Sequence, residues 1–140
     1  MKKLNIDYTA VAINTGGRKG HVKTDDGLLD FDVAMPKEIG GEGGKTNPEQ
    51  FFAAGYAACF GGALGAVAGK TSLRDSEITA KVHLGNYGPG DFGLAVDIFV
   101  KIPHTDSLEA AQKLVEEAHK VCPYSKATKG NIEVNVKAIS

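Results

Sequence analysis

The sequence has few cysteines and little net charge. Its 140 residues include two cysteines and carry a formal net charge of −1. A small secreted protein held together by disulfides would contain more cysteines, so that class is excluded. The balanced charge gives no reason to expect a nucleic acid or a membrane surface as partner. We therefore expect a cytoplasmic protein, in which a cysteine pair is more often catalytic, metal-binding or simply buried than structural.

Other common signals are missing as well. The first residues, MKKLNIDYTA, lack the apolar run of a secretory signal peptide. No cysteines or histidines have the short spacing typical of zinc ligands, and the glycine-rich stretch GGEGGK does not fit the full phosphate-binding pattern. With no repeat or linker, we predict a single domain over residues 1–140 that needs no metal or cofactor.

Alternating apolar and polar residues predict six β-strands. In chain order the segments are LNIDYTAVAI, HVKTDDG, LLDFDVAM, SEITAKVHLGNY, FGLAVDIFVKI and IEVNVKAI. Turn-forming stretches such as GPGD separate neighbouring strands, which favours antiparallel hairpins.

Two further segments predict helices. The first begins at Pro48, with Asn47 as its N-cap and Glu49 in its first turn, and ends at Lys70. The second is DSLEAAQKLVEEAHKVCPYS, which begins after Asp106 as cap and ends before Pro123. The order βββ–α–ββ–α–β predicts an α+β fold, with two helices packed on an antiparallel sheet.

The predicted helices differ in character. The second has one apolar face, made of Leu108, Ala111, Val115, Ala118 and Cys122. The first contains the uncharged run FFAAGYAACFGGALGAVAG, which at roughly 28 Å would almost cross a bilayer. Alanine and glycine favour membrane insertion only weakly, however, and the strands need a core helix. We therefore predict a helix buried on all sides rather than a membrane span.

The small residues of this first helix also bear on assembly. Its glycines form the pattern GxxxGxxxG, which permits another helix to approach closely. A single small sheet covers only one side of a helix. We therefore predict a homodimer in which the central helices of two subunits pack together.

Each predicted helix carries one cysteine on its core-facing side, Cys59 in the first and Cys122 in the second. The simplest role of a buried cysteine is that of a small apolar residue. Packing of the helices could instead bring the two sulfurs together. A buried thiol needs a nearby cation to become a reactive thiolate. Arg18, in the glycine-flanked loop GGRKG, is a candidate cation, and a carboxylate could orient it by bidentate pairing.

Three segments carry a family resemblance: GGRKGHV, IGGEGGKTNPEQFFAAGYAACF and CPYSKATKGNIEV. In this order they resemble the organic hydroperoxide resistance proteins, thiol peroxidases of the OsmC superfamily, over nearly the whole chain. The resemblance implies an OsmC-like α+β sheet wrapped around two core helices. It also implies an intertwined homodimer with two active sites at the interface.

The resemblance further implies which residues are catalytic. Cys59 would be the peroxidatic cysteine and Cys122 the resolving one, while Arg18 would activate the thiolate and Glu49 would hold Arg18. Glu49 and Cys59 lie about ten residues, or roughly 15 Å, apart along one straight helix. We therefore predict that Arg18 and Glu49 reach the Cys59 of the partner subunit. The alternative for Glu49 is a first-turn residue that complements the helix dipole.

The implied chemistry is the reduction of an organic hydroperoxide to an alcohol. Cys59 would become a sulfenic acid and then a disulfide with Cys122, which an external dithiol would reduce. The resemblance points to protein-bound dihydrolipoyl groups as that dithiol. An apolar substrate pocket is expected, although most of its predicted lining residues are expected to pack in the core. These residues are Phe51, Phe52, Tyr56 and Phe60.

Two other functions stay open at this point. One is an OsmC-type stress-induced peroxidase with a different peroxide preference, and the other is a non-catalytic module that binds an apolar small molecule. His119 could face Cys122, but a histidine that complements the dipole at the helix end is the simpler interpretation. Tyr124 and Ser125 are expected to be local structure that could also support the site, and the sequence leaves the detailed role of all three residues open.

Overall fold

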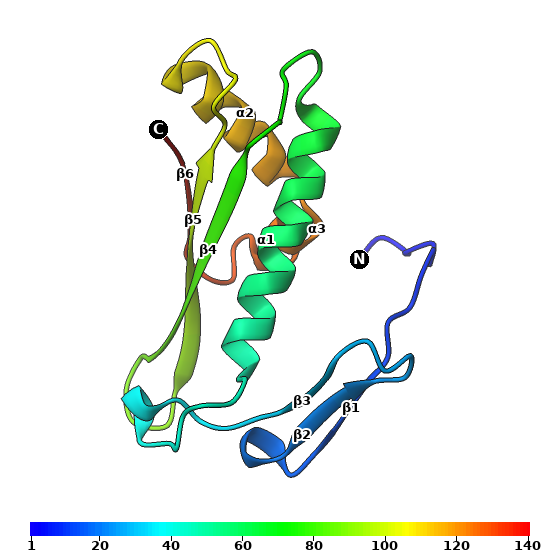
Figure 1. Cartoon of the computed structure of the whole chain (residues 1–140), viewed down its shortest axis with the longest axis vertical. Helices are drawn as coiled ribbons and strands as arrows, with labels where there is room; N and C mark the ends of the chain where they lie inside the picture. Colours follow the sequence, from blue (N-terminus) through cyan, green and yellow to red (C-terminus); the bar gives the residue numbers. More distant parts are fainter. The chain divides into compact units, whose positions relative to one another are not determined.

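The six strands form two separate three-stranded sheets. The computed structural model describes residues 1–140, and the chain divides into two units, Met1–Pro48 and Glu49–Ser140. The element order is β1–β2–β3–α1–β4–β5–α2–α3–β6, with short 3₁₀ turns on either side of β2 and β3 (Figure 1). The architecture is α+β, as predicted, but it contains two sheets rather than one.

The first unit contains an antiparallel sheet of short strands. They are β1 (Ala12–Thr15), β2 (His21–Thr24) and β3 (Asp30–Asp32), paired in that order. The predicted first strand, LNIDYTAVAI, is much longer than β1. Because β2 offers partners only from His21 to Thr24, the alternating residues before Ala12 have no strand to pair with inside this unit.

The second unit contains the longer strands. An antiparallel hairpin joins β4 (Glu77–Asn86) to β5 (Phe92–Lys101), and β6 (Val134–Ile139) pairs with the other edge of β5. The pairing of β5 with β6 is parallel, which corrects the prediction of a wholly antiparallel sheet. Two helices lie between β5 and β6 in the chain, and such a crossover returns the chain in the same direction.

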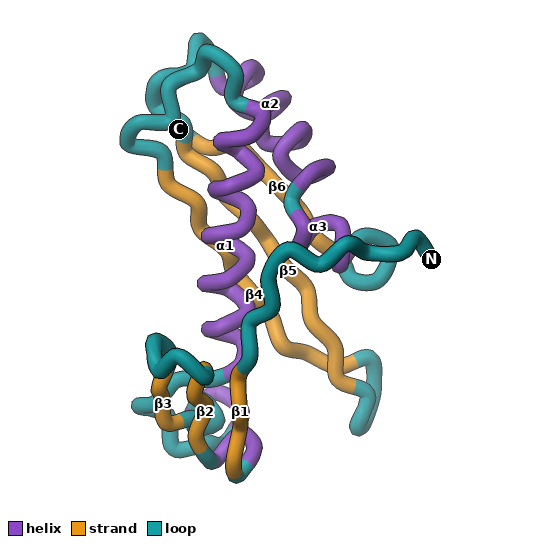
Figure 2. The backbone as a smooth tube through the Cα atoms, turned by 90° about the vertical axis from the view of Figure 1, so that its right-hand side faces the viewer, coloured by secondary structure: helices purple, strands orange, loops and turns teal.

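Three helices belong to this part of the chain: α1 (Pro48–Val67), α2 (Leu108–Val121) and the short α3 (Pro123–Thr128). Figures 1 and 2 show α1 and α2 on one face of the β4–β5–β6 sheet. The core lies between these layers. Its buried members are Tyr56, Phe60, Ala63, Leu64, Val96, Ile98, Val100, Ile102, Ala111, Val115, Ala118, Cys122 and Ala138.

Within one chain, α1 is buried on one side only, so its burial on all sides in a homodimer stays a prediction. It buries Tyr56, Phe60, Ala63 and Leu64, which lie on the side that faces the sheet and α2. By length and composition alone α1 could cross a membrane, and 22% of its most apolar window is buried in this chain. Since the buried side chains complete the core of the unit, we assign α1 as a core helix with one side left uncovered by its own chain.

The start of α2 differs from the prediction in one detail. Ser107, not Asp106, is the N-cap, and its hydroxyl accepts a hydrogen bond of 3.0 Å from the backbone N–H of Ala110. Leu108 therefore falls in the first turn and is 53% exposed, so it does not belong to the apolar face. The remaining predicted members of that face are buried.

In the first unit, His21 lies between two carboxylates and links β2 to β3. Its Nδ1 is 2.8 Å from Oδ1 of Asp32, and its Nε2 is hydrogen-bonded to Asp30. The hydrogen bond to Asp32, followed by that to Asp30, raises the pKa of His21 above its ordinary value. Protonated His21 thus stabilises this small sheet.

We predict that an NMR titration of His21 has its midpoint above the ordinary value of about 6.5. The stabilisation is fully present below that value and is lost as the pH rises through the raised pKa, because only the folded state holds the extra proton. Asp32→Asn should move the midpoint back toward 6.5. An unchanged midpoint in this variant would show that the carboxylate does not hold the imidazolium.

Candidate thiol site

The two cysteines meet where α2 ends. Cys59 lies in the middle of α1, and Cys122 lies between α2 and α3. Their Sγ atoms are 3.5 Å apart, and both thiols are free. Cys122 is fully buried, whereas Cys59 is half-buried. Of the two possibilities that the sequence left open, the structure has the one in which helix packing brings the sulfurs together, and Cys59 is the more accessible of the two.

Pro123 places Cys122 at this position. Proline lacks the N–H that would continue α2, but its fixed φ suits the first position of a new helix. The backbone N–H of Cys122 still bonds to the carbonyl of Ala118, and the carbonyl of Cys122 accepts from the N–H of Lys126. Cys122 therefore ends one helix and begins the next, with its side chain in the core.

The surroundings of Cys59 favour its neutral thiol within this unit. Burial is the main cause that raises the pKa of Cys59, and the neighbouring Cys122 raises it further. A backbone hydrogen bond from Tyr124, the second residue of α3, acts in the opposite direction but does not outweigh burial. A reactive thiolate at Cys59 thus requires a cation brought from elsewhere.

A buried chain of polar side chains lies beside the cysteines, and the sequence analysis missed it. Ser125 Oγ is 2.8 Å from the Tyr56 hydroxyl and 2.7 Å from His119 Nδ1. The Tyr56 hydroxyl is also 3.2 Å from Thr128 Oγ1. Burial, followed by the charge of Lys129, lowers the pKa of His119. The signal was available, since the hydroxyl of a tyrosine inside an uncharged helix needs a partner when it is buried.

An aromatic cluster joins α3 to α1. The ring of Tyr124 lies 6.1 Å from that of Phe52 and 5.5 Å from that of Tyr56, measured between centroids. Gly55 makes this packing possible, because a Cβ at this position would lie 2.7 Å from the Tyr124 hydroxyl oxygen. Next to the cluster is a mainly apolar hollow of about 480 Å³, with Phe52, Leu94, Tyr124 and Ile132 among its lining residues.

The predicted substrate residues therefore have different environments. Tyr56 and Phe60 are fully buried members of the core, and the Phe60 ring lies 6.5 Å from the imidazole of His119. Phe51 and Phe52 are half-buried, and Phe52 lines the apolar hollow. Tyr56 and Phe60 therefore pack in the core, and Phe51 and Phe52 are the more accessible pair.

Arg18 and Glu49 belong to different parts of the chain. Glu49 is in the first turn of α1. Arg18 is in the first unit, on the 3₁₀ turn Gly17–Lys19 that joins β1 to β2. The amide of Asn14 holds this turn by accepting from the N–H of Gly17 and donating to the carbonyl of His21. The role of both residues at Cys59 stays a prediction.

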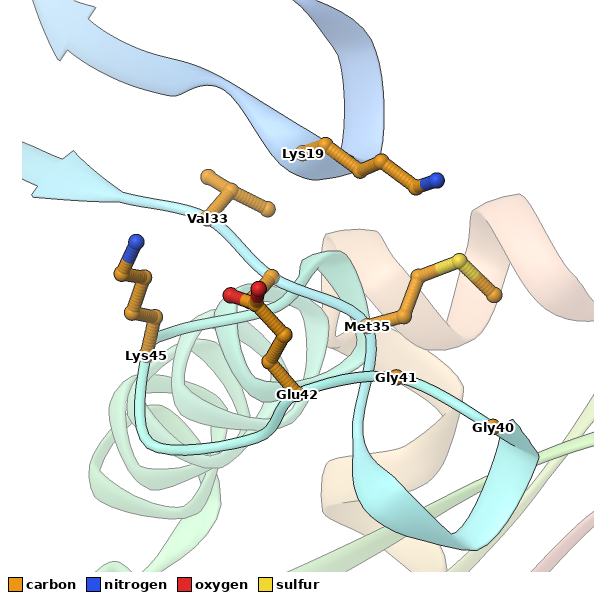
Figure 3. Close-up of a pocket in the computed structure, with 8 residues that line it drawn as sticks. Lys19, Val33, Met35, Gly40, Gly41, Glu42 and Lys45 are labelled. Atoms are coloured by element: carbon orange, nitrogen blue, oxygen red, sulfur yellow. The ribbon is translucent and has the colours of Figure 1, made fainter.

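The first unit has a hollow of its own, of about 600 Å³. Figure 3 shows Lys19 on one side of it, and Glu42 and Lys45 on the loop at the other side. Gly41 is required here, because a Cβ at this position would lie 2.0 Å from the carbonyl oxygen of Met35. The residues that line the hollow include charges of both signs and no cysteine.

Comparison with known proteins decides the family. Residues 41–137 match the family model described as OsmC-like protein. The chain belongs to the OsmC-like family. Its curated relatives include an organic hydroperoxide resistance protein of Xanthomonas axonopodis pv. citri, which is 49% identical over 133 residues, or 92% of each chain. Another, from Bacillus subtilis, is 50% identical over 134 residues, or 93% of this chain and 96% of the relative.

A solved structure gives the same result for this OsmC-like chain. The organic hydroperoxide resistance protein of Legionella pneumophila matches it with a TM-score of 0.90 and 48% identity. The match covers 97% of this chain and 100% of that protein. The family resemblance inferred from the sequence is thereby confirmed.

The contact between Gly55 and Tyr124 leads to a stability prediction. In a helix interior, Gly→Ala normally stabilises by about 0.5–1 kcal/mol. We expect Gly55→Ala to give no such gain, since the new methyl group displaces the Tyr124 hydroxyl. In a Tyr124→Phe background the same change should stabilise, because the closest contact is gone.

Urea unfolding of the four proteins in this double-mutant cycle measures the difference. An equal gain from Gly55→Ala in both backgrounds would show that the hydroxyl does not restrict this position.

Proposed function

We propose that this OsmC-like protein reduces organic hydroperoxides to alcohols with its cysteine pair. The observation that carries the proposal is the 3.5 Å separation of two free thiols, one of them half-buried. The names of its relatives, organic hydroperoxide resistance proteins, support a role in peroxide detoxification.

Cys59 is assigned as the peroxidatic cysteine and Cys122 as the resolving one. The assignment follows accessibility, because a substrate can approach half-buried Cys59 more easily than fully buried Cys122. The thiolate of Cys59 attacks the terminal oxygen of ROOH, so an S–O bond forms while the O–O bond breaks. The departing alkoxide takes up a proton and leaves as an alcohol, and Cys59 becomes a sulfenic acid.

The second step forms the disulfide. The Cys122 sulfur attacks the Cys59 sulfur, the S–O bond breaks, and the thiol proton leaves with the hydroxide as water. The sulfurs must approach from 3.5 Å to a bond length of about 2.05 Å. This is a small displacement for a cysteine at a helix junction.

Activation of Cys59 requires a positive charge, since burial raises its pKa. We assign this charge to Arg18, oriented by Glu49. Glu49 is in the first turn of α1 and Cys59 lies near the middle of the same continuous helix. For that reason we place the Arg18–Glu49 pair of one subunit at the Cys59 of its partner, in a homodimer with two active sites.

The uncovered side of α1 supports such a homodimer. This side is rich in alanine and glycine, and its own chain leaves it uncovered. Packing against a second copy of α1 would bury it, and small residues permit close approach of two helix backbones. Sedimentation of the purified protein would test this assembly.

The substrate is assigned as an organic rather than inorganic peroxide. The hollow near Cys122 is mainly apolar, and half-buried Phe52 lines it. We propose that this hollow and half-buried Phe51 receive an alkyl or fatty-acid group, whereas Tyr56 and Phe60 are fully buried in the core. Equal rates of reduction of hydrogen peroxide and of an alkyl hydroperoxide would instead favour an OsmC-type stress-induced peroxidase with a different peroxide preference.

Regeneration requires a dithiol that reduces the Cys59–Cys122 disulfide by exchange. We propose a protein-bound dihydrolipoyl group for this role and a cytoplasmic location for the cycle, because a reducing compartment keeps such dithiols available.

We predict that the protein consumes an alkyl hydroperoxide with dihydrolipoamide as reductant, and that Cys59→Ser abolishes this activity. Cys122→Ser should retain one rapid turnover per site, since only the resolving step is lost. Peroxide consumption and trapping of the sulfenic acid by dimedone measure the two steps. A Cys59 that reacts no faster than free cysteine in the wild type would favour the non-catalytic binding module.

We also predict that Arg18→Ala slows peroxide attack on Cys59 about tenfold or more at pH 7. An adjacent cation lowers a thiol pKa by roughly 1–3 units, so its loss shifts the pH–rate profile to higher pH. Glu49→Gln should shift the profile in the same direction by a smaller amount.

Arg18→Lys is the matched control, because it keeps the charge but not the planar guanidinium. It should restore part of the rate. A profile in Arg18→Ala that coincides with that of the wild type would remove Arg18 from the mechanism.

A further inference from the structure

The buried polar chain converges on Ser125. This residue is 2% exposed, and its hydroxyl contacts Tyr56 from α1 and His119 from α2. Its backbone carbonyl accepts hydrogen bonds from the hydroxyl of Thr128 and the N–H of Lys129. One small side chain therefore ties the start of α3 to both longer helices.

The hydrogen-bond directions are mutually consistent. If His119 carries its proton on Nδ1, it donates to the hydroxyl of Ser125, which in turn donates to the hydroxyl of Tyr56. The Tyr56 hydroxyl then donates to that of Thr128, which donates to the backbone carbonyl of Ser125. Every hydroxyl proton then has an acceptor, which a buried polar group requires. Such a closed set permits little movement of α3.

The segment that Ser125 holds is the one that contacts Cys59. Cys122, immediately before α3, provides the second sulfur, 3.5 Å from that of Cys59, and the ring of Tyr124 packs against Tyr56 of α1. Ser125 itself contacts neither sulfur in these hydrogen bonds. Any rotation or shift of α3 would therefore change the sulfur–sulfur distance and the Tyr124 ring contact together.

We propose that Ser125 is a positioning residue for the Cys59–Cys122 pair. Its hydroxyl fixes the start of α3 against α1 and α2 and so maintains a high effective concentration of one thiol at the other. The proposal deepens the proposed peroxidase function, in which it would serve the disulfide-forming step, but the effective concentration is defined without any peroxide.

The test is the equilibrium of the protein dithiol with a glutathione buffer, followed by mass spectrometry. Oxidised glutathione accepts two electrons from the protein thiols, which gives the Cys59–Cys122 disulfide and two molecules of reduced glutathione. We expect Ser125→Ala to lower the effective concentration about tenfold or more, because misplacement by about 1 Å can cost as much as a hundredfold in proximity. Ser125→Thr, which keeps the hydroxyl, should restore most of the loss.

Two further variants distinguish an effect on the positions of the two cysteines from a general loss of stability of the fold. Tyr56→Phe keeps the aromatic ring but removes the hydroxyl that meets Ser125, so it should lower the effective concentration in the same direction. Val100→Ala creates a cavity in the core and should destabilise the fold without this effect. Val100 lies six residues beyond Leu94, the β5 residue that shares a hollow with Tyr124.

The outcomes are distinct. An effective concentration that is unchanged in both Ser125→Ala and Tyr56→Phe would overturn the proposal, as would an equal loss in Val100→Ala. If the wild type shows no reaction with peroxides while the Ser125 effect is present, the proposed function fails and the positioning role stands.

Discussion

The break between α2 and α3 is the constraint on which the thiol site depends. Pro123 ends one helix and starts another, so Cys122 lies at a junction rather than inside a helix. The next two residues then attach α3 to α1, Tyr124 through its ring and Ser125 through its hydroxyl. The sulfur of Cys122 thereby lies 3.5 Å from Cys59 without a covalent bond between them. A redox pair needs this combination of proximity and freedom.

The composition of α1 makes the arrangement possible. Gly55 admits the Tyr124 ring, and Tyr56 and Phe60 on the same helix fill the core. The other side of α1 is rich in alanine and glycine and is not covered by its own chain. This uncovered side is the basis of the proposed dimer. Burial alone would make Cys59 unreactive, because it raises the pKa of the thiol. The proposed Arg18 charge offsets this effect, so the assembly and the reactivity of the thiol are linked.

Local patterns in the sequence predicted many features of the fold and of the thiol site correctly. Capping residues gave the start of α1 at Pro48, and helix periodicity gave the core-facing positions that allowed Cys59 and Cys122 to meet. The parallel β6 did not follow, since alternation shows that a strand exists but not which edge it joins. The Ser107 cap was missed because Asp106 is an equally good capping residue. The Ser125 network depends on tertiary packing of three helices, which no local pattern reports.

The central claim is that Cys59 and Cys122 act as one redox unit, and a single-turnover experiment tests it most directly. The fully reduced protein is mixed with one equivalent of cumene hydroperoxide, quenched with a thiol-blocking reagent at successive times, and mapped by peptide mass spectrometry. The account predicts that a Cys59 sulfenic acid forms first and that a disulfide joining Cys59 and Cys122 within one chain replaces it. Oxidation that stops at Cys59 while Cys122 stays reduced would contradict the account.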